Sequence, residues 1–354
     1  MRVEPMEAGS AYTGRLPRGC VLCRQGTKMV LLVSGRCSTG CFYCPLSLEK
    51  RGKNVVFANE LKAGSDEDVI EEAKTIGALG TGITGGDPVA CLDRTVHFIK
   101  LLKETFGKRH HIHLYTSSLD ISAYHALEDA GLDELRLHPP MEAWGQLEGS
   151  GIAEFKKTSR MKMGMEVPAM PGKEEELRRL VHYAQEAGLD FVNLNELEFS
   201  EGNWEELKDR GMEVKDDVSS AVLGSEETAL SVVQGKHTIP VHYCSSSFKD
   251  SVQLRKRIKR RALRVALPSD MITDEGMLLK GVVEGPADEI MAVLRDKYGV
   301  PDGLFRRDVE KERVEVAPWV LKDLAPLLPY ESFLVEEYPT ADRLEVEREP
   351  LKPR

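Results

Sequence analysis

The 354-residue sequence predicts an α/β fold built on a parallel sheet or barrel, with a small α+β domain at its C-terminal end. Between residues 28 and 199, six strand-like segments alternate with helix-like segments, which is typical of repeated βαβ units. After residue 200 this alternation stops, and from residue 267 shorter elements follow in another order. We therefore expect a large parallel layer first and a separate domain after it.

Local patterns predict each element. Lys28–Ser34 is a continuous apolar run that Gly35 ends, and Ser65–Ala78 opens with a Ser-Asp cap before apolar residues at helical spacing. The other predicted strands are 80–84, 111–116, 134–138, 161–168 and 191–199, with one further strand at 238–244, and the other predicted helices are 91–106, 121–130 and 174–187. In such folds the active site lies in the loops at the carboxyl ends of the strands.

Four parts are expected along the chain. The first is an N-terminal segment, 1–26, which is loop-like and carries a pair of cysteines that is a candidate metal site. The barrel follows at 27–247 and includes an acidic, helical insertion at 201–235, and a basic helix occupies 248–266. The last part, 267–354, is the small accessory domain, with a strand expected at 278–284, a helix at 287–297 and short strands near 333–337 and 343–347.

Composition excludes several classes of protein. No apolar run approaches the roughly 18 residues that span a bilayer, and the N-terminus has no secretory signal, so we expect a cytoplasmic protein without a membrane span. The formal net charge of −10 argues against a chain that coats nucleic acid along its whole length, but it leaves local basic patches open. Five Asn and five Gln among many Glu, Lys and Arg are typical of a thermophile.

The cysteines carry most of the functional information. The chain has seven, at positions 20, 23, 37, 41, 44, 91 and 244, and the first five fall within 25 residues. An odd number with this crowding does not fit a disulfide framework in a cytosolic chain of this size. Clustered thiolates in a reducing compartment usually indicate metal or redox chemistry.

The sequence Cys37-Ser-Thr-Gly-Cys41-Phe-Tyr-Cys44 directly follows the first predicted strand. Three thiolates can hold a [4Fe–4S] cluster at three irons and leave the fourth iron open for a ligand. A zinc loop is the alternative, but structural zinc usually takes four protein ligands. The spacing therefore favours cluster binding over zinc.

This stretch resembles the CxxxCxxC signature of the radical S-adenosylmethionine (radical SAM) superfamily, including the aromatic residue before the last cysteine. Gly82-Ile-Thr-Gly-Gly-Asp-Pro88 is similar to the superfamily's GGE motif, with Asp87 where Glu is commoner. Met165–Gly172 resembles the segment that helps to hold the cofactor's ribose and adenine. The resemblance covers roughly 28–245 and is strongest to proteins related to the pyruvate formate-lyase activating enzyme.

The resemblance implies a partial (β/α)6 TIM-like radical SAM barrel with a [4Fe–4S] cluster and S-adenosyl-L-methionine as cofactors. One electron, from a reduced ferredoxin or flavodoxin-type donor, would cleave the sulfonium to methionine and a 5′-deoxyadenosyl radical, which then abstracts hydrogen from a substrate. The protein would tune the cluster by burial and hydrogen bonds and exclude water around the radical.

The resemblance also assigns residues. Cys37, Cys41 and Cys44 would ligate the cluster, the backbone of Tyr43 would lie against the adenine, and Gly85 and Gly86 would border the methionine moiety. Asp87 falls where the family contacts the amino group, although the Glu-to-Asp change puts that contact in doubt. Arg136 and Glu166 are candidates for the carboxylate and ribose contacts, the alternative being that each faces solvent at a strand end.

A second metal site is expected at Cys20-Val-Leu-Cys23, because CxxC pairs are typical of metal or dithiol chemistry. A thioredoxin-like role would need the pair at a helix start, which the pattern of residues 12–26 does not predict. Cys244 and His242 are the candidate further ligands, if the last barrel strand returns beside the first. Such a site could hold zinc or an auxiliary iron–sulfur cluster, and the alternative is that Cys244 is an ordinary buried thiol. Cys91 is expected in the core.

The substrate is predicted from a basic segment. Residues 249–264 contain eight Lys or Arg and one Asp, and Arg255, Arg257, Arg260 and Arg261 lie outside an apolar stripe at helical spacing. Such a face fits a phosphate backbone, so RNA, and with it tRNA modification, is one hypothesis. The alternative for this segment is a helix that pairs with the acidic insertion. An activating enzyme for a glycyl-radical protein and a small-molecule enzyme of cofactor or lipid biosynthesis fit the core motifs equally well.

Overall fold

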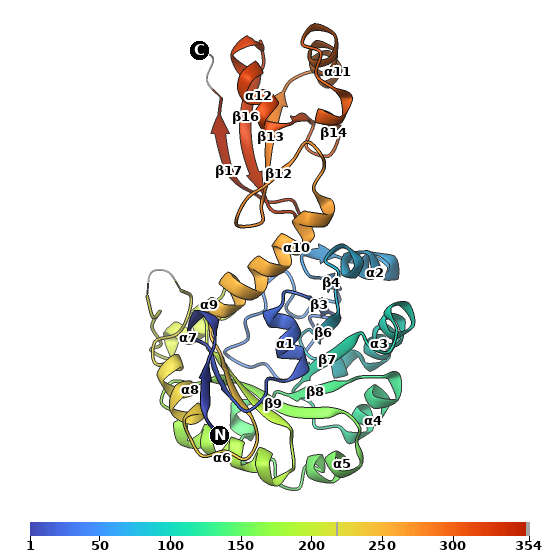
Figure 1. The fold of residues 1–354 in the computed structure, drawn as a ribbon. Coiled ribbons are helices and arrows are strands. Elements are labelled where there is room, and N and C mark those ends of the chain that lie inside the picture. The colour runs from blue at the N-terminus through green and yellow to red at the C-terminus, as the bar shows by residue number, and fades with distance from the viewer. Residues whose placement is uncertain (217–218, 352–354) are drawn as a thin grey trace. The chain divides into compact units, whose positions relative to one another are not determined.

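The computed structural model describes residues 1–216 and 219–351, and these divide into two compact units (Figure 1). The first unit comprises 1–74 and 78–254, and the second comprises 75–77 and the residues from 255 onward. Residues 217–218 of the predicted insertion and 352–354 of the predicted accessory domain lie outside the described residues. In the part of the chain that is described, no helix has the length and apolar character needed to cross a membrane.

A large curved sheet organises the first unit (Figure 1). Its central strands are all parallel, and in the order of the sheet they are β11(Val241–Cys244), β10(Phe191–Glu196), β9(Lys162–Ala169), β8(Glu134–Leu137), β7(His111–Thr116), β6(Gly80–Thr84) and β3(Lys28–Leu32). Short antiparallel strands extend both edges: β1(Val3–Pro5) and β2(Ala11–Thr13) next to β11, and β4(Phe57–Ala58) and β5(Leu61–Lys62) next to β3. The predicted α/β class with a large parallel sheet is confirmed.

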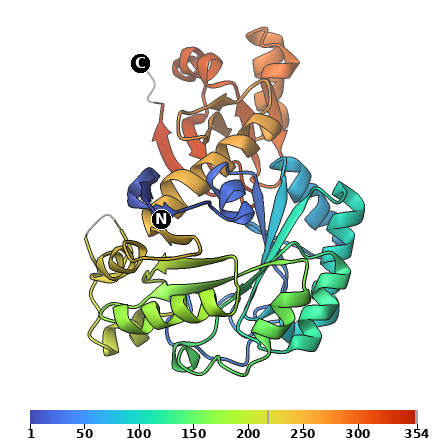
Figure 2. The same cartoon turned by 60° about the horizontal axis from the view of Figure 1, so that its bottom comes forward.

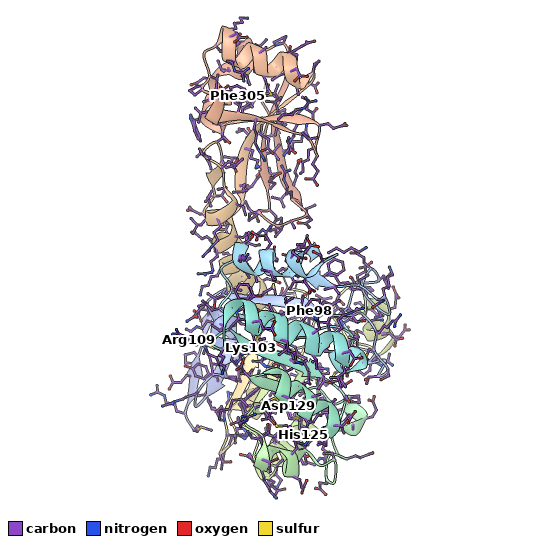
Figure 3. The ribbon with its side chains drawn as sticks, turned by 90° about the vertical axis from the view of Figure 1, so that its right-hand side faces the viewer. Phe98, Lys103, Arg109, His125, Asp129 and Phe305 are labelled. Atoms are coloured by element: carbon purple, nitrogen blue, oxygen red, sulfur yellow. The ribbon has the colours of Figure 1, made fainter. Side chains whose placement is uncertain are left out.

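Helices cover the outside of this sheet. They are α2(Asp66–Thr75), α3(Leu92–Phe106), α4(Ile121–Ala130), α5(Ile152–Thr158), α6(Glu174–Glu186), α7(Trp204–Asp209) and α8(Ser225–Val233). Figure 2 shows the helices α3 to α6 along the outer face of the strands, and Figure 3 shows α3, with Phe98 and Lys103, beside α4, with His125 and Asp129. Asp120 caps α4 by accepting hydrogen bonds from the backbone of Ser122 and Ala123, and Gly131 ends it in the left-handed conformation.

The expectation that residues 1–26 are loop-like is wrong. Besides β1 and β2, this segment forms the helix α1(Arg18–Arg24), which Figure 1 shows enclosed by the curved sheet. The helix packs against β3, β6 and β7, and its Leu22 is fully buried. A seven-residue helix has little stability of its own, so tertiary packing decides its formation, and local pattern could not reveal it. The CxxC pair therefore does lie on a helix.

The basic segment is not one regular helix. It consists of α9(Ser246–Phe248), the π-helical η4(Lys249–Leu254) and α10(Arg255–Val265), and the boundary between the two units falls between η4 and α10. The short 3-10 turns of the first unit are η1(Glu7–Gly9), η2(Pro88–Cys91) and η3(Met141–Ala143).

An antiparallel sheet organises the second unit. Its strands are β12(Met271–Ile272), β13(Leu278–Glu284), β14(Phe305–Asp308), β15(Arg313–Val316), β16(Glu331–Glu337) and β17(Glu345–Pro350), and its other helical elements are α11(Ala287–Ala292), η5(Val293–Lys297), η6(Asp302–Leu304), α12(Pro318–Leu324) and η7(Ala325–Leu327). Strand alternation separates the two sheet faces: Val314 and Val316 join an apolar core with Ile290 and Leu321, while Lys280 and Glu315 on the other face form a buried ion pair 3.1 Å long.

Candidate active site

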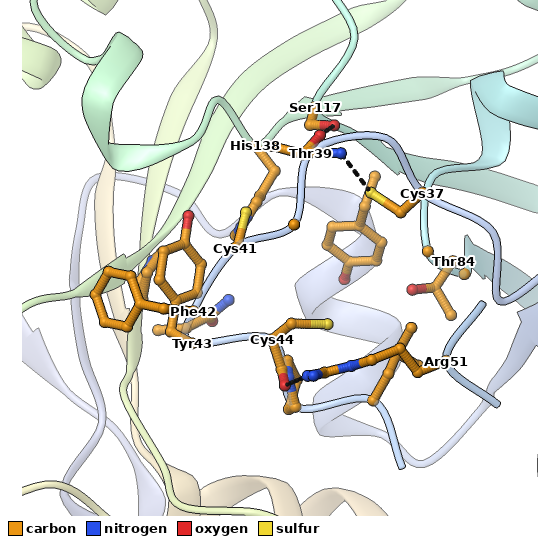
Figure 4. Close-up of a pocket in the computed structure, with 18 of the residues that line it drawn as sticks. Cys37, Thr39, Cys41, Phe42, Tyr43, Cys44, Arg51, Thr84, Ser117 and His138 are labelled. Carbon is orange, nitrogen blue, oxygen red and sulfur yellow. Dashed lines mark hydrogen bonds between the residues drawn. The ribbon is translucent and has the colours of Figure 1, made fainter. Parts of the chain in front are cut away.

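A cavity of about 720 Å³ lies at the carboxyl ends of the parallel strands (Figure 4). Thr84, Thr116 and Glu196, which end β6, β7 and β10, line it, as do residues at or near the ends of β8 and β9. Its volume falls within the range of about 300–1,000 Å³ that is typical of cofactor and small-molecule sites. The cavity is therefore placed where folds of this class carry their chemistry.

Cys37, Cys41 and Cys44 all line this cavity, on the loop that follows β3 (Figure 4). The Thr39 N–H donates to Cys37 Sγ at 3.4 Å, and the Cys44 N–H donates to the Cys41 carbonyl at 3.1 Å. Thr39 Oγ1 lies 2.7 Å from Ser117 Oγ, which belongs to the segment that follows β7. The loop is thus tied to the sheet next to the cavity by a side-chain contact as well as by its own turns.

The donor set of this loop fits an iron–sulfur cluster. Burial is the main cause that raises the pKa of Cys41, and the neighbouring charges of Cys37 and Cys44 raise it further. Thiolates at these positions would repel one another, and a cationic cluster offsets that repulsion when it displaces the protons. Across the described residues, no three His, Cys, Asp or Glu side chains converge closely enough to enclose a single metal ion. A [4Fe–4S] cluster takes each cysteine on a different iron and so bridges separated thiols.

The glycine pair Gly85 and Gly86 packs the loop after β6 against the cysteine loop and lines the cavity. The Gly86 N–H donates to the Ser34 carbonyl at 2.8 Å. A Cβ atom at Gly85 would overlap the Ser34 carbonyl oxygen, and one at Gly86 would overlap that of Arg36. Glycine is therefore required here by close backbone packing, in addition to any approach of a ligand.

Asp87 does not line the cavity, and its buried carboxylate is fully engaged within the protein. Its Oδ1 accepts from the Val89 N–H at 2.9 Å and from Thr116 Oγ1 at 2.7 Å. Its Oδ2 accepts from Ser117 Oγ at 2.6 Å and from the N–H groups of Ser117 and Ser118 at 3.0 and 3.2 Å. The predicted cofactor contact of Asp87 has no support in this geometry. Asp87 instead fixes Ser117, whose hydroxyl contacts that of Thr39.

Arg136 and Glu166 do not face solvent, since 2% and 6% of their surfaces are exposed. Arg136 Nη1 donates to Glu166 Oε2 at 2.5 Å, and Arg136 Nε donates to Glu134 Oε1 at 2.7 Å. Glu166 lines the cavity, whereas Arg136 lies below it. The structure thus brings the two predicted residues together as a buried ion pair.

The carboxylate of Glu166 stays ionised despite its burial. Burial alone would raise its pKa, but the charge of Arg136 and hydrogen bonds from Asn193 and Asn195 outweigh that effect and lower the pKa to about 2. The amide of Asn193 donates to Oε2 at 2.7 Å and that of Asn195 donates to Oε1 at 2.9 Å. A fixed negative charge therefore borders the cavity opposite the cysteine loop.

Tyr43 lines the cavity, and its backbone carbonyl accepts a hydrogen bond from Asn203 Nδ2 at 3.1 Å. Burial raises the pKa of the Tyr43 phenol well above its usual value, so this hydroxyl is neutral. Its ring lies 5.9 Å from that of His138. These two rings make up an aromatic part of the wall (Figure 4).

Sequence reasoning missed several residues that line the cavity: Thr84, Ser117, His138, Asn195, Glu198 and Lys249. His138 Nδ1 lies 2.6 Å from the Glu166 carbonyl oxygen, so Nδ1 carries the proton and Nε2 carries the lone pair. Burial lowers the pKa of His138, which keeps the ring neutral. Lys249 Nζ donates to Glu198 Oε1 at 2.8 Å. The position of His138 at the end of a predicted strand was the available signal for it.

The predicted second group of ligands lies inside the sheet and outside the cavity lining. Cys20 Sγ accepts hydrogen bonds from Arg136 Nη2 and from Asn193 Nδ2, each at 3.4 Å. Burial raises the pKa of Cys20 to about 11. His242 is the register partner of Asn193, and Cys244 is that of Asn195, so the strand β11 places both next to this region.

The four arginines proposed for RNA lie on α10 in the second unit. Arg255 pairs with Glu275 at 2.7 Å, and Arg261 Nε donates to the Pro339 carbonyl at 2.5 Å. Arg260 donates to the carbonyl oxygens of Ile76 and Gly77 at 3.2 and 3.0 Å. Arg257 is on the same helix and also has an interaction partner. The guanidinium groups of Arg255, Arg260 and Arg261 thus contribute to the internal structure of their unit.

Comparison with known proteins identifies the family. A protein of Methanocaldococcus jannaschii, provisionally named a glycyl-radical enzyme activating enzyme, is 38% identical over 362 residues, which cover 95% of this chain and 93% of that protein. The chain belongs to the radical SAM superfamily. Within it, this radical SAM enzyme belongs to the same family as the archaeal protein. A family model described as a domain of unknown function (DUF8061) matches residues 276–351 of its second unit.

Solved structures also match this radical SAM enzyme. Streptococcus suis SuiB bound to S-adenosylmethionine is 15% identical, with a TM-score of 0.42, and the match covers 62% of this chain and 50% of that one. The radical S-adenosylmethionine methyltransferase TsrM from Kitasatospora setae, with cobalamin and a [4Fe–4S] cluster bound, is 12% identical, with a TM-score of 0.38 and coverage of 71% and 54%. The chain spans about half the length of these two proteins.

Proposed function

We propose that this enzyme cleaves S-adenosyl-L-methionine reductively at a [4Fe–4S] cluster held by Cys37, Cys41 and Cys44, and that its substrate is a glycyl-radical protein. The observation that carries the choice of substrate is the name of the archaeal relative, which matches almost the whole chain at 38% identity. In this proposal the curved sheet acts as the partial (β/α)6 barrel of the superfamily. The cytoplasmic location and a reduced ferredoxin or flavodoxin-type electron donor are parts of the same proposal.

The cysteine loop supplies the cluster ligands in this proposal. When bound, the cluster and S-adenosyl-L-methionine would supply a one-electron cleavage of a carbon–sulfur bond. The loop itself must keep its thiols at a constant distance from the opposite wall of the cavity. The contact of Thr39 with Ser117 and the hydrogen bond from Asn203 to the Tyr43 carbonyl serve that purpose, one on each side of Cys41.

Glu166 is the residue that we assign to the ribose of the cofactor. Its Oε1 accepts one hydrogen bond, from Asn195, and an ionised carboxylate oxygen can accept a second from a hydroxyl group. Its low pKa keeps it an acceptor throughout the physiological range. Gly85, Gly86 and the Tyr43 backbone are assigned to the methionine and adenine parts because all three line the same cavity.

Arg136 acts as a positioning residue in this proposal. The sequence suggested that it contacts the cofactor's carboxylate, but its guanidinium group lies below the cavity and is engaged by Glu134, Glu166 and Cys20. It therefore holds Glu166 in place and sets its charge. His138, whose neutral Nε2 can accept a hydrogen bond, is a further candidate for contact with the cofactor or substrate.

The RNA hypothesis has no support from the relative's name or from α10. Arg255, Arg260 and Arg261 donate to carbonyl oxygens and to Glu275 inside the second unit. RNA modification and small-molecule biosynthesis are thus the outcomes that the test below must separate from glycyl-radical activation.

Anaerobic turnover tests the proposal. The reconstituted full-length protein is supplied with S-adenosyl-L-methionine and dithionite, and 5′-deoxyadenosine is measured by chromatography. We expect its formation in the wild type and its loss in the variant Cys37→Ala/Cys41→Ala/Cys44→Ala. A candidate glycyl-radical protein is then added, and we expect a protein-bound radical in electron paramagnetic resonance in proportion to the 5′-deoxyadenosine formed.

The negative outcomes are distinct. A wild-type protein that holds about four irons in its cluster yet forms no 5′-deoxyadenosine contradicts the radical SAM chemistry. If turnover is stimulated by RNA or by small metabolites, and no added glycyl-radical protein acquires a radical, the assignment of the substrate is wrong while the chemistry stands.

A further inference from the structure

The candidate ligands inside the sheet come from two places far apart in the sequence. Cys20 and Cys23 lie on α1, three residues and so about one turn apart, which places them on the same side of the helix. His242 and Cys244 lie on β11, two residues apart, so their side chains point to the same face of the sheet. The helix α1 packs inside the sheet, where both pairs can face each other (Figure 1).

Hydrogen bonds join the two pairs. Asn193 is adjacent to His242 in the register of β10 and β11. Its Nδ2 donates to Cys20 Sγ at 3.4 Å and its Oδ1 lies 3.3 Å from His242 Nδ1. Asn195, which donates inward to Glu166, is in turn adjacent to Cys244. The face of β11 that carries His242 and Cys244 is therefore on the same side of the sheet as α1.

His242 has the tautomer of a metal ligand. The Nδ2 group of Asn193 donates to Glu166 and to Cys20, so its Oδ1 must accept from His242 Nδ1. The proton is thus on Nδ1, and Nε2 carries a lone pair. This Nε2 is buried without a hydrogen-bond partner, in a side chain that is 97% buried. Metal-binding histidines typically donate their other ring N–H in this way, and an unpartnered buried acceptor is costly unless something binds it.

We propose that Cys20, Cys23, Cys244 and His242 form a second metal centre inside the sheet, below the cavity that Cys37, Cys41 and Cys44 line. Three thiolates and one imidazole are a donor set for either an iron–sulfur cluster or zinc. In the rotamers that the structure shows, these four side chains do not enclose a single ion. Because Cys20 Sγ now points toward Arg136 and Asn193, the thiols reach a metal by rotation about their Cα–Cβ bonds between staggered positions.

The surroundings suit thiolate ligands. Arg136 and Asn193 both donate to Cys20 Sγ, and hydrogen bonds to ligating sulfur atoms stabilise the charged form and tune a cluster. The two residues are held in turn by Glu166, so the centre would share its support with the wall of the cavity. No other cysteine takes part: Cys91 Sγ contacts the Pro88 carbonyl at 3.5 Å, near the start of α3.

Metal analysis of the anaerobically reconstituted full chain tests this proposal. We expect the variant Cys37→Ala/Cys41→Ala/Cys44→Ala to lose about four irons and to retain a remainder of iron with sulfide, or of zinc. Adding Cys20→Ser and Cys23→Ser to that variant should remove the remainder. Iron with acid-labile sulfide identifies a cluster, and one zinc without sulfide identifies a single ion. The matched control Cys91→Ser should change neither the iron content nor the zinc content.

A second measurement leaves the cysteines of the proposed centre unchanged. Cobalt(II) added to the metal-free loop variant should give the intense absorption of thiolate-to-cobalt charge transfer, and the substitution His242→Gln should shift it. The proposal is overturned if the folded loop variant retains neither iron nor zinc and gives no such absorption. Formation of 5′-deoxyadenosine is measured separately, so failure of this proposal and failure of the proposed function are distinguishable.

Discussion

The two cysteine groups are held in opposite ways. Cys37 is exposed, Cys41 and Cys44 are half-buried, and their loop depends on a few contacts such as Thr39 with Ser117. Cys20 is buried on a helix inside the sheet and touches Arg136 and Asn193, which belong to a network of buried charges. The comparison teaches that the first group can change without affecting the fold, whereas the second group is part of what stabilises it.

The largest expected effect separates activity from stability in the loop. Cys41→Ala should reduce 5′-deoxyadenosine formation to background because the cluster loses one of three ligands. The free energy of unfolding of the metal-free protein should change by less than about 1 kcal/mol, since a half-buried side chain is lost from a loop. Chromatography and urea denaturation measure the two effects. Substantial residual turnover would contradict the assigned ligand set.

The next effect concerns the buried network. Arg136→Leu leaves Glu134 and Glu166 buried without their cation, and breaking a buried pair in this way costs about 3–5 kcal/mol. Urea denaturation of the metal-free protein measures the loss. The control Arg255→Ala removes an exposed pair with Glu275 and should cost no more than about 1 kcal/mol. Equal losses in the free energy of unfolding would contradict the larger contribution that we expect from the buried ion pairs.

A third prediction uses pH. The folded-state pKa of Glu166, about 2, lies below its ordinary value of 4.5, so its ionisation stabilises the folded protein above pH 4.5 and that contribution is lost as the pH falls toward 2. The difference corresponds to about 3 kcal/mol. In Glu166→Gln, the free energy of unfolding should fall less steeply with decreasing pH over this range. Parallel pH profiles for the two proteins would show that Glu166 is not held ionised.

The smallest effect concerns the support of the loop. Asp87→Asn replaces acceptors for Ser117 and Ser118 with an amide that donates, and mispaired buried groups of this kind cost about 1–3 kcal/mol. We expect the KM for S-adenosyl-L-methionine to rise more than kcat falls, because Ser117 no longer fixes Thr39. Thr39→Val removes only the contact between Thr39 Oγ1 and Ser117 Oγ. It should reproduce the change in KM without the loss of stability.

The sequence predicted those parts of the site whose residues lie close together along the chain. Cys37, Cys41, Cys44, Gly85 and Gly86 were found because their spacing is itself the signal, and the structure places all of them on one cavity. The parallel strands were predicted because short strand-like segments alternate with helix-like segments between residues 28 and 199.

What sequence could not predict depends on register. That Asn195 and Glu166 share a hydrogen bond, or that Asn193 lies beside His242, follows from how β9, β10 and β11 align, and no local pattern contains this alignment. The helix α1 was missed for a related reason: its burial, with Leu22 fully enclosed, comes from strands that follow it in the chain. Asp87 was placed at the cofactor because a motif identifies a position and does not show where its side chain turns.

The side-chain amide of Asn193 contacts three other side chains. Its Nδ2 group donates one hydrogen bond to the carboxylate of Glu166, which borders the cavity, and another to Cys20 Sγ. Its oxygen accepts from the imidazole of His242. A substitution that removes the amide removes all three contacts together. The surroundings of Cys20 and the support of Glu166 are therefore coupled through this one side chain.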